Sequence, residues 1–473
     1  MQELTMDLDP GSRIPLYEQI YEYIKSEIRS GAIPAREKLP STRALSHYLE
    51  VSRSTVELAY EQLLSEGYIE AEPCRGFFVA SIEGLYQIRQ SRQVQEKPQQ
   101  QENRTQYRYD FTPNGIDLKS FPYSIWRKLS REVLMDDRLE LFRQGDSQGE
   151  YELRREICNY LHQARGVNCT PEQLIIGAGN EYLIMLLSTI IGQDHRIAFE
   201  NPTYRQAYRV FENLSYQIDT VDMDQNGMEV KKLEQKNVNM AYVMPSHQYP
   251  LGTVMPLKRR LELLKWAEKE PDRYIIEDDY DSEFRYKGKP IPALQGYDIN
   301  GKVIYIGTFS RSIAPAIRMS YLVLPMPLLK EYYRKSRFMN STVPRTEQMI
   351  VKNFLAQGYY ERHLNKMRAL YKSRHDVLLE TIRPLLKSGS CEISGENAGV
   401  HLLLTFRDGR TEEELIRLAA LEDIKIYGLS QYFAEQEKAA GGPATVLLGY
   451  ANLSEDSIRE AAGRLVRRLR KEG

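Results

Sequence analysis

The chain has 473 residues, a formal net charge of −1 and 42% hydrophobic residues. This length predicts two or three domains, and the balanced charge means that any nucleic-acid interface must be local. Charged residues interrupt the first fifty positions, and the four cysteines and seven histidines lack metal-ligand spacing. We therefore expect a cytoplasmic protein with no membrane span and no metal site.

Residues 1–80 predict a small module of three helices and a β-hairpin. Apolar residues recur with helical spacing from Tyr17 to Ile28, and Gly31 ends this first helix. A second helix is expected to begin after Ser41, whose hydroxyl is a suitable N-cap. The residues expected on its buried face are Ala44, Leu45, Tyr48 and Leu49.

The segment "SRSTVELAYEQLLSEGY" predicts the clearest helix of the module. Its apolar residues lie on one face from Val56 to Leu64, Ser54 and Glu57 are spaced for a capping box, and Gly67 ends the helix. The following "YIEAEPCRGFFVA" predicts two short strands around a Pro-Cys-Arg-Gly tip.

A stretch rich in Gln and Arg covers residues 81–108 and has almost no apolar periodicity. Such a composition buries too little apolar surface to offset the entropy lost on ordering, so it predicts a flexible linker. The sequence therefore divides into a small domain at 1–80, a linker at 81–108 and a large domain at 109–473.

Residues 109–473 alternate short buried strands with amphipathic segments. The candidate strands are "RIAF" (196–199), "MAYVM" (240–244), "YIIED" (274–278), "KVIYIG" (302–307) and "SYLVLP" (320–325). This alternation predicts an α/β fold with a largely parallel sheet, whose ligand site lies at the carboxyl ends of the strands. Polar clusters such as "EDDYD" and "GTFSRS" follow the strands at those ends.

The segment "VSRSTV" provides the short polar and basic residues that the second helix of a helix-turn-helix needs in the major groove. Residues 13–80 resemble the winged helix-turn-helix of GntR-type regulators, which implies binding to double-stranded DNA. The residues expected at the DNA are Arg43, Ser52, Arg53, Ser54, Thr55, Arg75 and Gly76. The alternative is a helical interaction module, because residues 1–80 hold eight Lys or Arg against thirteen Asp or Glu. Glu57 also stands where the family often has an arginine.

The motifs "GEYELRREICNYLHQARGV", "PSHQYPLGTVMP", "IIEDDYDSEFRY" and "GTFSRSIAPAIRMSYLVLP" resemble those of fold-type I aminotransferases and follow the same order. With the winged helix in front, the chain resembles the MocR subfamily of GntR-type regulators, whose best known member senses γ-aminobutyrate. The resemblance implies a multidomain protein, a small α+β winged helix-turn-helix followed by an α/β fold-type I pyridoxal-phosphate-dependent transferase-like domain. It also implies a homodimer, because fold-type I sites are shared between subunits.

The resemblance further implies a site for pyridoxal phosphate. Asp278 would pair with the pyridine nitrogen, Tyr280 would hydrogen-bond to the phenolate oxygen, and Tyr204 would stack on the ring. The phosphate would lie at a turn-to-helix junction, where free N–H groups bind anions. The residues expected around the phosphate are Gly179, Asn180, Thr308, Ser310 and Arg318. His247 and Tyr249 belong to the motif that normally lines the ring.

Arg311 departs from the family pattern, because the Schiff-base lysine normally follows the serine of "TFS". A guanidinium stays protonated and offers no free amine to attack an aldehyde. We therefore expect non-covalent binding of pyridoxal phosphate and no transamination. Two other possibilities stay open, namely binding of the amine form or a cofactor–amine adduct, and a degenerate pocket. An engineered exchange of lysine for arginine would also give this sequence.

The end of the site that would bind a ligand carboxylate also departs from the family pattern. Gln431 stands where the γ-aminobutyrate sensor has an arginine, and Leu447 and Leu448 precede "GYA", where aminotransferases often have one. Arg205 is the candidate substitute, since a carboxylate prefers a bidentate guanidinium partner. We therefore expect an effector other than γ-aminobutyrate.

The sequence leads to one main interpretation and two rivals. The main interpretation is a transcriptional regulator whose aminotransferase-like domain senses a pyridoxal-phosphate species or an amine and thereby changes DNA affinity. One rival is a pyridoxal-phosphate-dependent aminotransferase with an accessory DNA-binding module, against which Arg311 argues. The other is a degenerate aminotransferase scaffold that only dimerises the DNA-binding modules.

Overall fold

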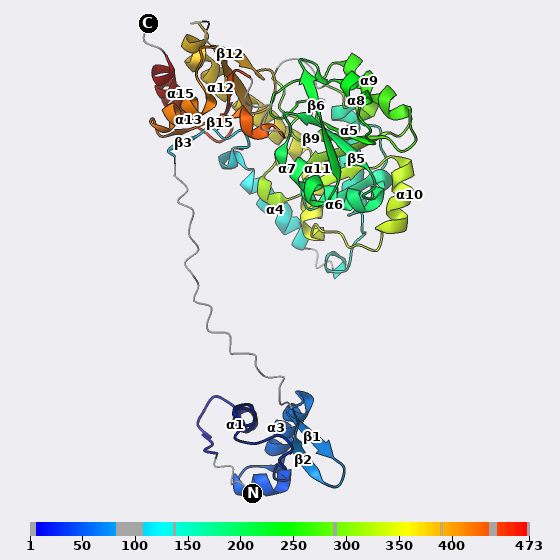
Figure 1. Ribbon diagram of the computed structural model, residues 1–473, viewed down its shortest axis with the longest axis vertical. Helices are drawn as coiled ribbons and strands as arrows, with labels where there is room; N and C mark the ends of the chain where they lie inside the picture. Colours follow the sequence, from blue (N-terminus) through cyan, green and yellow to red (C-terminus); the bar gives the residue numbers. More distant parts are fainter. Residues whose placement is uncertain are drawn as a thin grey trace. The chain divides into compact units, whose positions relative to one another are not determined.

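The computed structural model describes residues 6–81, 107–135, 139–286, 291–387, 389, 391–434 and 442–470. The chain divides into two compact units, residues 1–105 and 106–473, of which the first is blue and the second runs from cyan to red in Figure 1. Most of the predicted linker, residues 82–106, lies outside the described residues.

The first unit consists of the predicted three helices and an antiparallel hairpin. Its elements are α1 (Leu16–Ser30), α2 (Thr42–Tyr48), α3 (Arg53–Ser65), β1 (Ile69–Glu72) and β2 (Gly76–Val79). Helix α3 packs against both other helices. The apolar stripes predicted for α1 and α3 meet in one core that includes fully buried Ile20, Ile24, Val56 and Leu63.

The predicted capping box of α3 is wrong. Ser52 is the N-cap, and its side chain accepts a hydrogen bond from the backbone N–H of Thr55. The helix begins at Arg53, so Ser54 already lies in its first turn and Glu57 is free to pair with another side chain.

The predicted N-cap of α2 is confirmed, because the Ser41 side chain accepts a hydrogen bond from the backbone N–H of Ala44. The predicted buried face is only partly correct. Leu45 is buried and Leu49 is half-buried, whereas Ala44 and Tyr48 are exposed. A helix of only seven residues has about two turns, so few of its side chains reach the core.

An eight-stranded sheet forms the centre of the second unit, in the order β4-β11-β10-β9-β8-β5-β6-β7. All five predicted strands are present. The strands are β4 (Leu174–Gly177), β5 (Arg196–Asn201), β6 (Gln217–Asp224), β7 (Gly227–Met228), β8 (Met240–Val243), β9 (Tyr274–Asp279), β10 (Val303–Thr308) and β11 (Ser320–Val323). The five strands from β10 to β6 in this order are parallel, and β11 is antiparallel to both of its neighbours.

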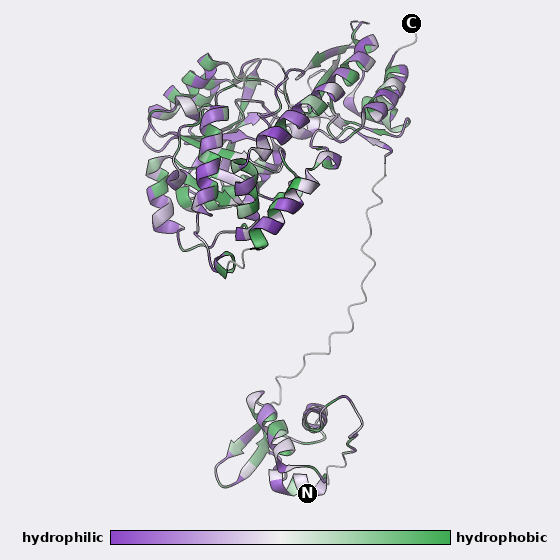
Figure 2. Ribbon diagram, turned by 180° about the vertical axis from the view of Figure 1, so that it is seen from behind, coloured by the Kyte–Doolittle hydropathy of each residue, from purple (hydrophilic) through white to green (hydrophobic). Residues whose placement is uncertain are grey.

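Alternating side chains of the strands bury both faces of this sheet under helices. In β8, Met240 and Tyr242 belong to the core formed with α6, α7 and α10, and Ala241 and Val243 belong to the core formed with α8 and α9. These helices are α6 (Asn180–Ile191), α7 (Arg205–Asn213), α8 (Val230–Glu234), α9 (Leu257–Glu268) and α10 (Met326–Lys335). Hydrophilic and hydrophobic positions alternate along the helices in Figure 2, as expected for helices with one buried face.

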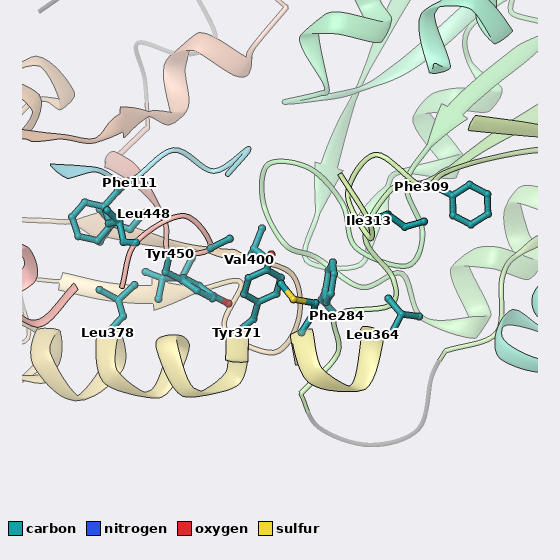
Figure 3. Close-up of a cluster of buried hydrophobic side chains, with 14 of the residues drawn as sticks. Phe111, Phe284, Phe309, Ile313, Leu364, Tyr371, Leu378, Val400, Leu448 and Tyr450 are labelled. Atoms are coloured by element: carbon teal, nitrogen blue, oxygen red, sulfur yellow. The ribbon is translucent and has the colours of Figure 1, made fainter. Parts of the chain in front are cut away.

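A smaller antiparallel sheet, ordered β12-β13-β16-β15, lies beside the long helix α12 (Tyr359–Leu386). In Figure 3, Leu378 of α12 lies near the side chains of the small sheet, and Leu364 lies near Ile313, which follows β10. Helix α12 therefore connects the small sheet to the segment after β10. The sheet strands are β12 (Cys391–Ser394), β13 (His401–Phe406), β15 (Tyr427–Gly428) and β16 (Ala444–Gly449).

The remaining elements pack around these two sheets. They are β3 (Tyr109–Asp110), β14 (Ile424–Lys425), α4 (Tyr123–Leu134), α5 (Tyr151–Arg165), α11 (Arg345–Ala356), α13 (Glu412–Ala420) and α15 (Glu455–Leu469). Strands β3 and β14 form a separate parallel pair. Within the part of the chain that the structure describes, no helix is long and apolar enough to cross a membrane. No metal-binding group of three His, Cys, Asp or Glu side chains is found among the same residues.

Candidate functional site

A cavity lies where β9 and β10 end and α6 begins. All nine residues predicted to surround the cofactor line this cavity, namely Gly179, Asn180, Tyr204, Asp278, Tyr280, Thr308, Ser310, Arg311 and Arg318. The other described lining residues are Glu181, Met244, Tyr249 and Ser320. The position follows from the parallel strands, whose carboxyl ends meet at one edge of the sheet.

Asp278 lies buried near the end of β9. The hydroxyl of Tyr242, in the neighbouring strand β8, donates a hydrogen bond to one carboxylate oxygen, and Asn180 Nδ2 lies 3.4 Å from the other. Burial raises the pKa of Asp278 to about 7, although the Tyr242 hydrogen bond lowers it. The carboxyl group can therefore pair with a protonated ring nitrogen or share its proton.

Tyr280 lines the cavity and contacts the buried side chain of His247. The Tyr280 hydroxyl lies 2.9 Å from His247 Nδ1, which lies equally close to the carboxylate of Asp281. A carboxylate only accepts, so His247 Nδ1 carries the proton in this pair and the Tyr280 hydroxyl keeps its own. Burial raises the pKa of Tyr280 well above its usual value, so this side chain is a hydrogen-bond donor at neutral pH.

Tyr204 is the residue before helix α7 and lines the cavity beside Tyr249. The two rings meet edge to face with their centroids 5.8 Å apart. The Tyr204 hydroxyl donates to Gln206 Oε1 at 2.8 Å, and Gln206 donates to Glu181 at 2.6 Å. Burial raises the pKa of Tyr204 to about 12. These contacts fix the position of the ring at the cavity.

Gly179 is the N-cap of α6 and has φ 102° and ψ 166°, a conformation that other residues rarely adopt. No side chain caps the helix, so its first N–H groups are available to an anion. A Cβ atom at Gly179 would lie 2.3 Å from a terminal nitrogen of Arg318, which in turn pairs with Glu181 at 2.7 Å. The glycine therefore leaves the space that the arginine occupies at the helix end.

The turn after β10 carries Thr308, Ser310 and Arg311 to the cavity. The Thr308 hydroxyl oxygen accepts a hydrogen bond from the backbone N–H of Ser310 at 3.1 Å and lies 2.9 Å from the Ser320 hydroxyl. These hydrogen bonds hold the turn that presents Arg311.

Arg311 contacts two neutral groups. One terminal nitrogen donates to Asn114 Oδ1 at 2.5 Å, and the guanidinium carbon lies 5.8 Å from the centre of the Tyr280 ring. Its other terminal nitrogen is buried without a hydrogen-bond partner. The arginine therefore brings a fixed positive charge, and no reactive amine, to the position expected for the lysine.

The residues that line the cavity suit the polar groups of pyridoxal phosphate, whereas Arg311 cannot form the covalent bond. Asn180 Oδ1 and one nitrogen of Arg311 are buried polar atoms without a partner, which a polar ligand would satisfy. The open N–H groups at the start of α6, with Arg318 beside Gly179, suit a phosphate, and Asp278 suits a pyridine nitrogen.

The candidate carboxylate partner is not brought to the site. Arg205 lies against the Tyr208 ring, 4.8 Å from its centre, and is not among the described residues that line the cavity. Leu447 and Leu448 are buried in β16, and Gln431 is exposed.

Several polar partners of the site were not predicted, among them Asn114, Glu181 and Tyr242. The only signal in the sequence was the hydroxyl of Tyr242 inside a buried strand, because a buried tyrosine usually needs a hydrogen-bond partner.

The predicted DNA-contacting residues lie on α2, on the start of α3 and at the hairpin. Arg43 and Gly76 occupy α2 and the first position of β2. Arg75 pairs with Glu72, and its guanidinium carbon lies 5.5 Å from the Phe78 ring centre. These contacts hold the Arg75 side chain at the tip of the β1–β2 hairpin.

The first turn of α3 is ordered by its own side chains. The Ser52 hydroxyl lies 2.8 Å from that of Ser54 and 2.7 Å from that of Thr55. Arg53 pairs with Glu57 at 2.7 Å, and both side chains are exposed. The guanidinium must leave or share this partner before it contacts a base.

Two protein families match the chain. The family of aminotransferases of class I and II matches residues 118–465, and the bacterial regulatory proteins of the gntR family match residues 16–79. The first range lies within the second unit and the second range within the first unit.

Relatives with the same two parts cover almost the whole chain. YhdI, an uncharacterized HTH-type transcriptional regulator of Bacillus subtilis (strain 168), is 40% identical over 457 residues, 97% of this chain and 96% of that protein. The probable rhizopine catabolism regulatory protein MocR of Rhizobium meliloti is 30% identical over 97% of this chain and 94% of that protein. The crystal structure of Pyrococcus horikoshii kynurenine aminotransferase has the same fold as the second unit, with a TM-score of 0.67 at 24% identity, over 77% of this chain and 91% of that one. The chain belongs to the MocR subfamily of GntR-type regulators, in which an aminotransferase class I and II domain follows a winged helix-turn-helix.

Proposed function

We propose that the chain is a DNA-binding transcriptional regulator whose second unit holds pyridoxal phosphate without a covalent bond and senses a vitamin B6 species or an amine. The observation that carries this proposal is the cavity in which eight residues suited to that cofactor surround Arg311. The names of the full-length relatives, which are regulators, support the DNA-binding part.

The residues of the cavity have separate roles in this proposal. Asp278 would pair with the ring nitrogen, Tyr280 would donate to the phenolate oxygen, and Tyr204 would pack on the ring. Arg318 and the open N–H groups of α6 would bind the phosphate. Pyridoxal phosphate, when bound, supplies an aldehyde that reacts with amines.

Catalysis is not part of the proposed function. An aminotransferase needs a side-chain amine that binds the cofactor and then carries protons, and Arg311 cannot do either because its guanidinium stays protonated. The role of Arg311 is instead to supply positive charge and hydrogen-bond donors at the cavity.

We also propose that two copies of the chain associate and place two winged helices on paired half-sites of DNA. Large apolar side chains in the described part of residues 134–142 support a subunit interface there. Leu134, Met135, Leu139 and Phe142 are each between 56% and 78% exposed, which is unusual for apolar residues so close in sequence.

The test uses the full-length chain and DNA fragments that it selects from genomic DNA of its source. Affinity for a selected fragment is measured with and without saturating pyridoxal phosphate, and we expect a change of at least about fivefold. Unchanged DNA affinity with the cofactor demonstrably bound would favour the scaffold interpretation. A Gly179→Ala variant is the control, because it should bind the fragment and lose the response.

A further inference from the structure

Arg311 is the cation of the cavity for which the described residues provide no carboxylate partner. Its contacts are the Asn114 amide and the face of Tyr280, and one of its terminal nitrogens is buried and unpartnered. Arg318, the other arginine of the cavity, pairs with Glu181 at 2.7 Å. A half-buried guanidinium that has one buried, unpartnered nitrogen and no anion beside it favours a ligand that supplies an acceptor.

The groups near Arg311 do not cancel its charge. Glu181 is paired with Arg318 and Asp281 with His247. Burial raises the pKa of Asp278, which lines the same cavity, to about 7, so it is only partly ionised at neutral pH. His401 stays neutral, because burial, with a smaller effect of the neighbouring Arg311 charge, lowers its pKa to about 3. This side of the cavity therefore attracts an anion or a hydrogen-bond acceptor and repels a second cation.

The substituents of a vitamin B6 ring follow a fixed order, and this order determines which of them faces Arg311. The oxygen at position 3 and the phosphate arm at position 5 flank the 4′ group, which is opposite the ring nitrogen. With Asp278 at the nitrogen, Tyr280 at the 3-oxygen and Arg318 at the phosphate, the 4′ group faces the turn that carries Arg311.

We infer that Arg311 selects the chemical form of the ligand, so that the cavity takes vitamin B6 phosphates with an oxygen at 4′ and rejects the amine form. An aldehyde, alcohol or carboxylate oxygen accepts a hydrogen bond from the unpartnered guanidinium nitrogen. An ammonium group at the same position has no acceptor to offer and is repelled by the arginine. This inference rests on the proposed function, because it assumes that the ligand is a vitamin B6 phosphate.

The test compares pyridoxine 5′-phosphate with pyridoxamine 5′-phosphate by titration calorimetry of the full-length chain at pH 7.5. These ligands differ only in a hydroxyl or an ammonium group at 4′, and neither forms a covalent bond with surface lysines. We expect the hydroxyl form to bind at least about tenfold more tightly. Equal or tighter binding of the amine form would overturn the inference and leave the proposed function standing. If neither ligand bound, the proposed function itself would fail.

Two variants assign the selectivity to Arg311. Arg311→Gln removes the charge and keeps a donor for Asn114, so the difference between the two ligands should shrink to less than about threefold. Arg318→Gln should weaken both ligands equally and preserve their ratio, since the phosphate is common to both. A ratio that is unchanged in Arg311→Gln would show that another group makes the selection. The native protein decides the main question even if a variant does not fold.

Discussion

The Arg53 guanidinium and the Glu57 carboxylate lie 2.7 Å apart on the exposed surface of helix α3. This pair occupies successive turns of the helix that the winged fold would place in the major groove. An exposed pair at this spacing stabilises a helix by only about 0.3–0.5 kcal/mol. DNA can therefore displace Glu57 at little cost, and the carboxylate that remains repels the phosphates.

Substitutions of this pair should change DNA affinity in opposite directions. Arg53→Ala should weaken binding to a selected fragment by about 1–3 kcal/mol, because a base contact is lost. Glu57→Ala should strengthen binding, because it frees the guanidinium and removes a negative charge. Fluorescence anisotropy at fixed salt measures both, and Glu61→Ala, an exposed acidic position one turn further on, is the control. Unchanged sequence-specific binding by Arg53→Ala would mean that α3 is not the recognition helix.

Gly179→Ala should abolish tight binding of phosphorylated ligands. Gly179 and Gly192, at the two ends of α6, have nearly the same backbone angles, φ 102° and ψ 166° against φ 95° and ψ 164°. The backbone strain of an alanine should therefore lower the free energy of unfolding by a similar amount at either position, about 1–3 kcal/mol. Only at Gly179 would the new Cβ displace Arg318, since no atom lies within 4 Å of a Cβ at Gly192. Calorimetry should show at least about tenfold weaker binding of pyridoxine 5′-phosphate to Gly179→Ala alone, and equal loss in both variants would contradict this role of the glycine.

Asp278→Asn should change the pH dependence of stability. Burial raises the pKa of Asp278 from its ordinary 3.8 to about 7, so folding favours the protonated carboxyl group. The stabilisation is complete below about pH 4 and is lost as the pH rises through about 7. The free energy of unfolding of the native chain should therefore fall relative to that of the variant across this range, by on the order of 3 kcal/mol.

Denaturant unfolding at several pH values, without ligand, measures this difference. Desolvation also raises the pKa of the Glu200 and Glu283 carboxyl groups to about 7, but both groups are present in the native chain and in the variant, so their effects cancel in the comparison. Asparagine keeps an acceptor for Tyr242. A stability difference that did not vary with pH would show that Asp278 is ionised throughout.

Arg311→Lys should give the chain a covalent bond to pyridoxal phosphate. The lysine amine can attack the aldehyde, whereas the guanidinium cannot. Borohydride reduction followed by mass spectrometry should find one cofactor per chain, attached at position 311. Arg318→Lys places an amine in the same cavity, at the phosphate end, and should not be labelled. If cofactor bound to Arg311→Lys and remained unattached, the 4′ group would not face this position.

The sequence pattern was sufficient to predict five strands of the large sheet, and the resemblance to fold-type I aminotransferases indicated nine of the residues around the cavity. The alternation of buried strands with helices predicted a largely parallel sheet. Because the carboxyl ends of parallel strands meet at one edge, Tyr204, Asp278 and Thr308 lie at the same edge. The partners of these residues were not predictable, because they depend on which strands and loops become neighbours. Tyr242 reaches Asp278 across 36 residues, and Asn114 reaches Arg311 across 197.

The wrong predictions for the cap of α3 and the buried face of α2 have a similar cause. Ser52 and Ser54 were equally suitable caps for α3, and the choice depended on where the turn before the helix ends. Tyr48 satisfied the spacing of a buried face, but a short α2 left it outside the core.

The most direct test of the account is titration calorimetry of the full-length native chain with pyridoxal phosphate, followed by borohydride reduction and mass spectrometry. The account predicts saturable binding with about one cofactor per chain, and a reduced protein that carries no cofactor at position 311. Absence of saturable binding would reduce the second unit to a scaffold. Stoichiometric attachment after reduction would contradict the claim that this regulator holds its cofactor without a covalent bond.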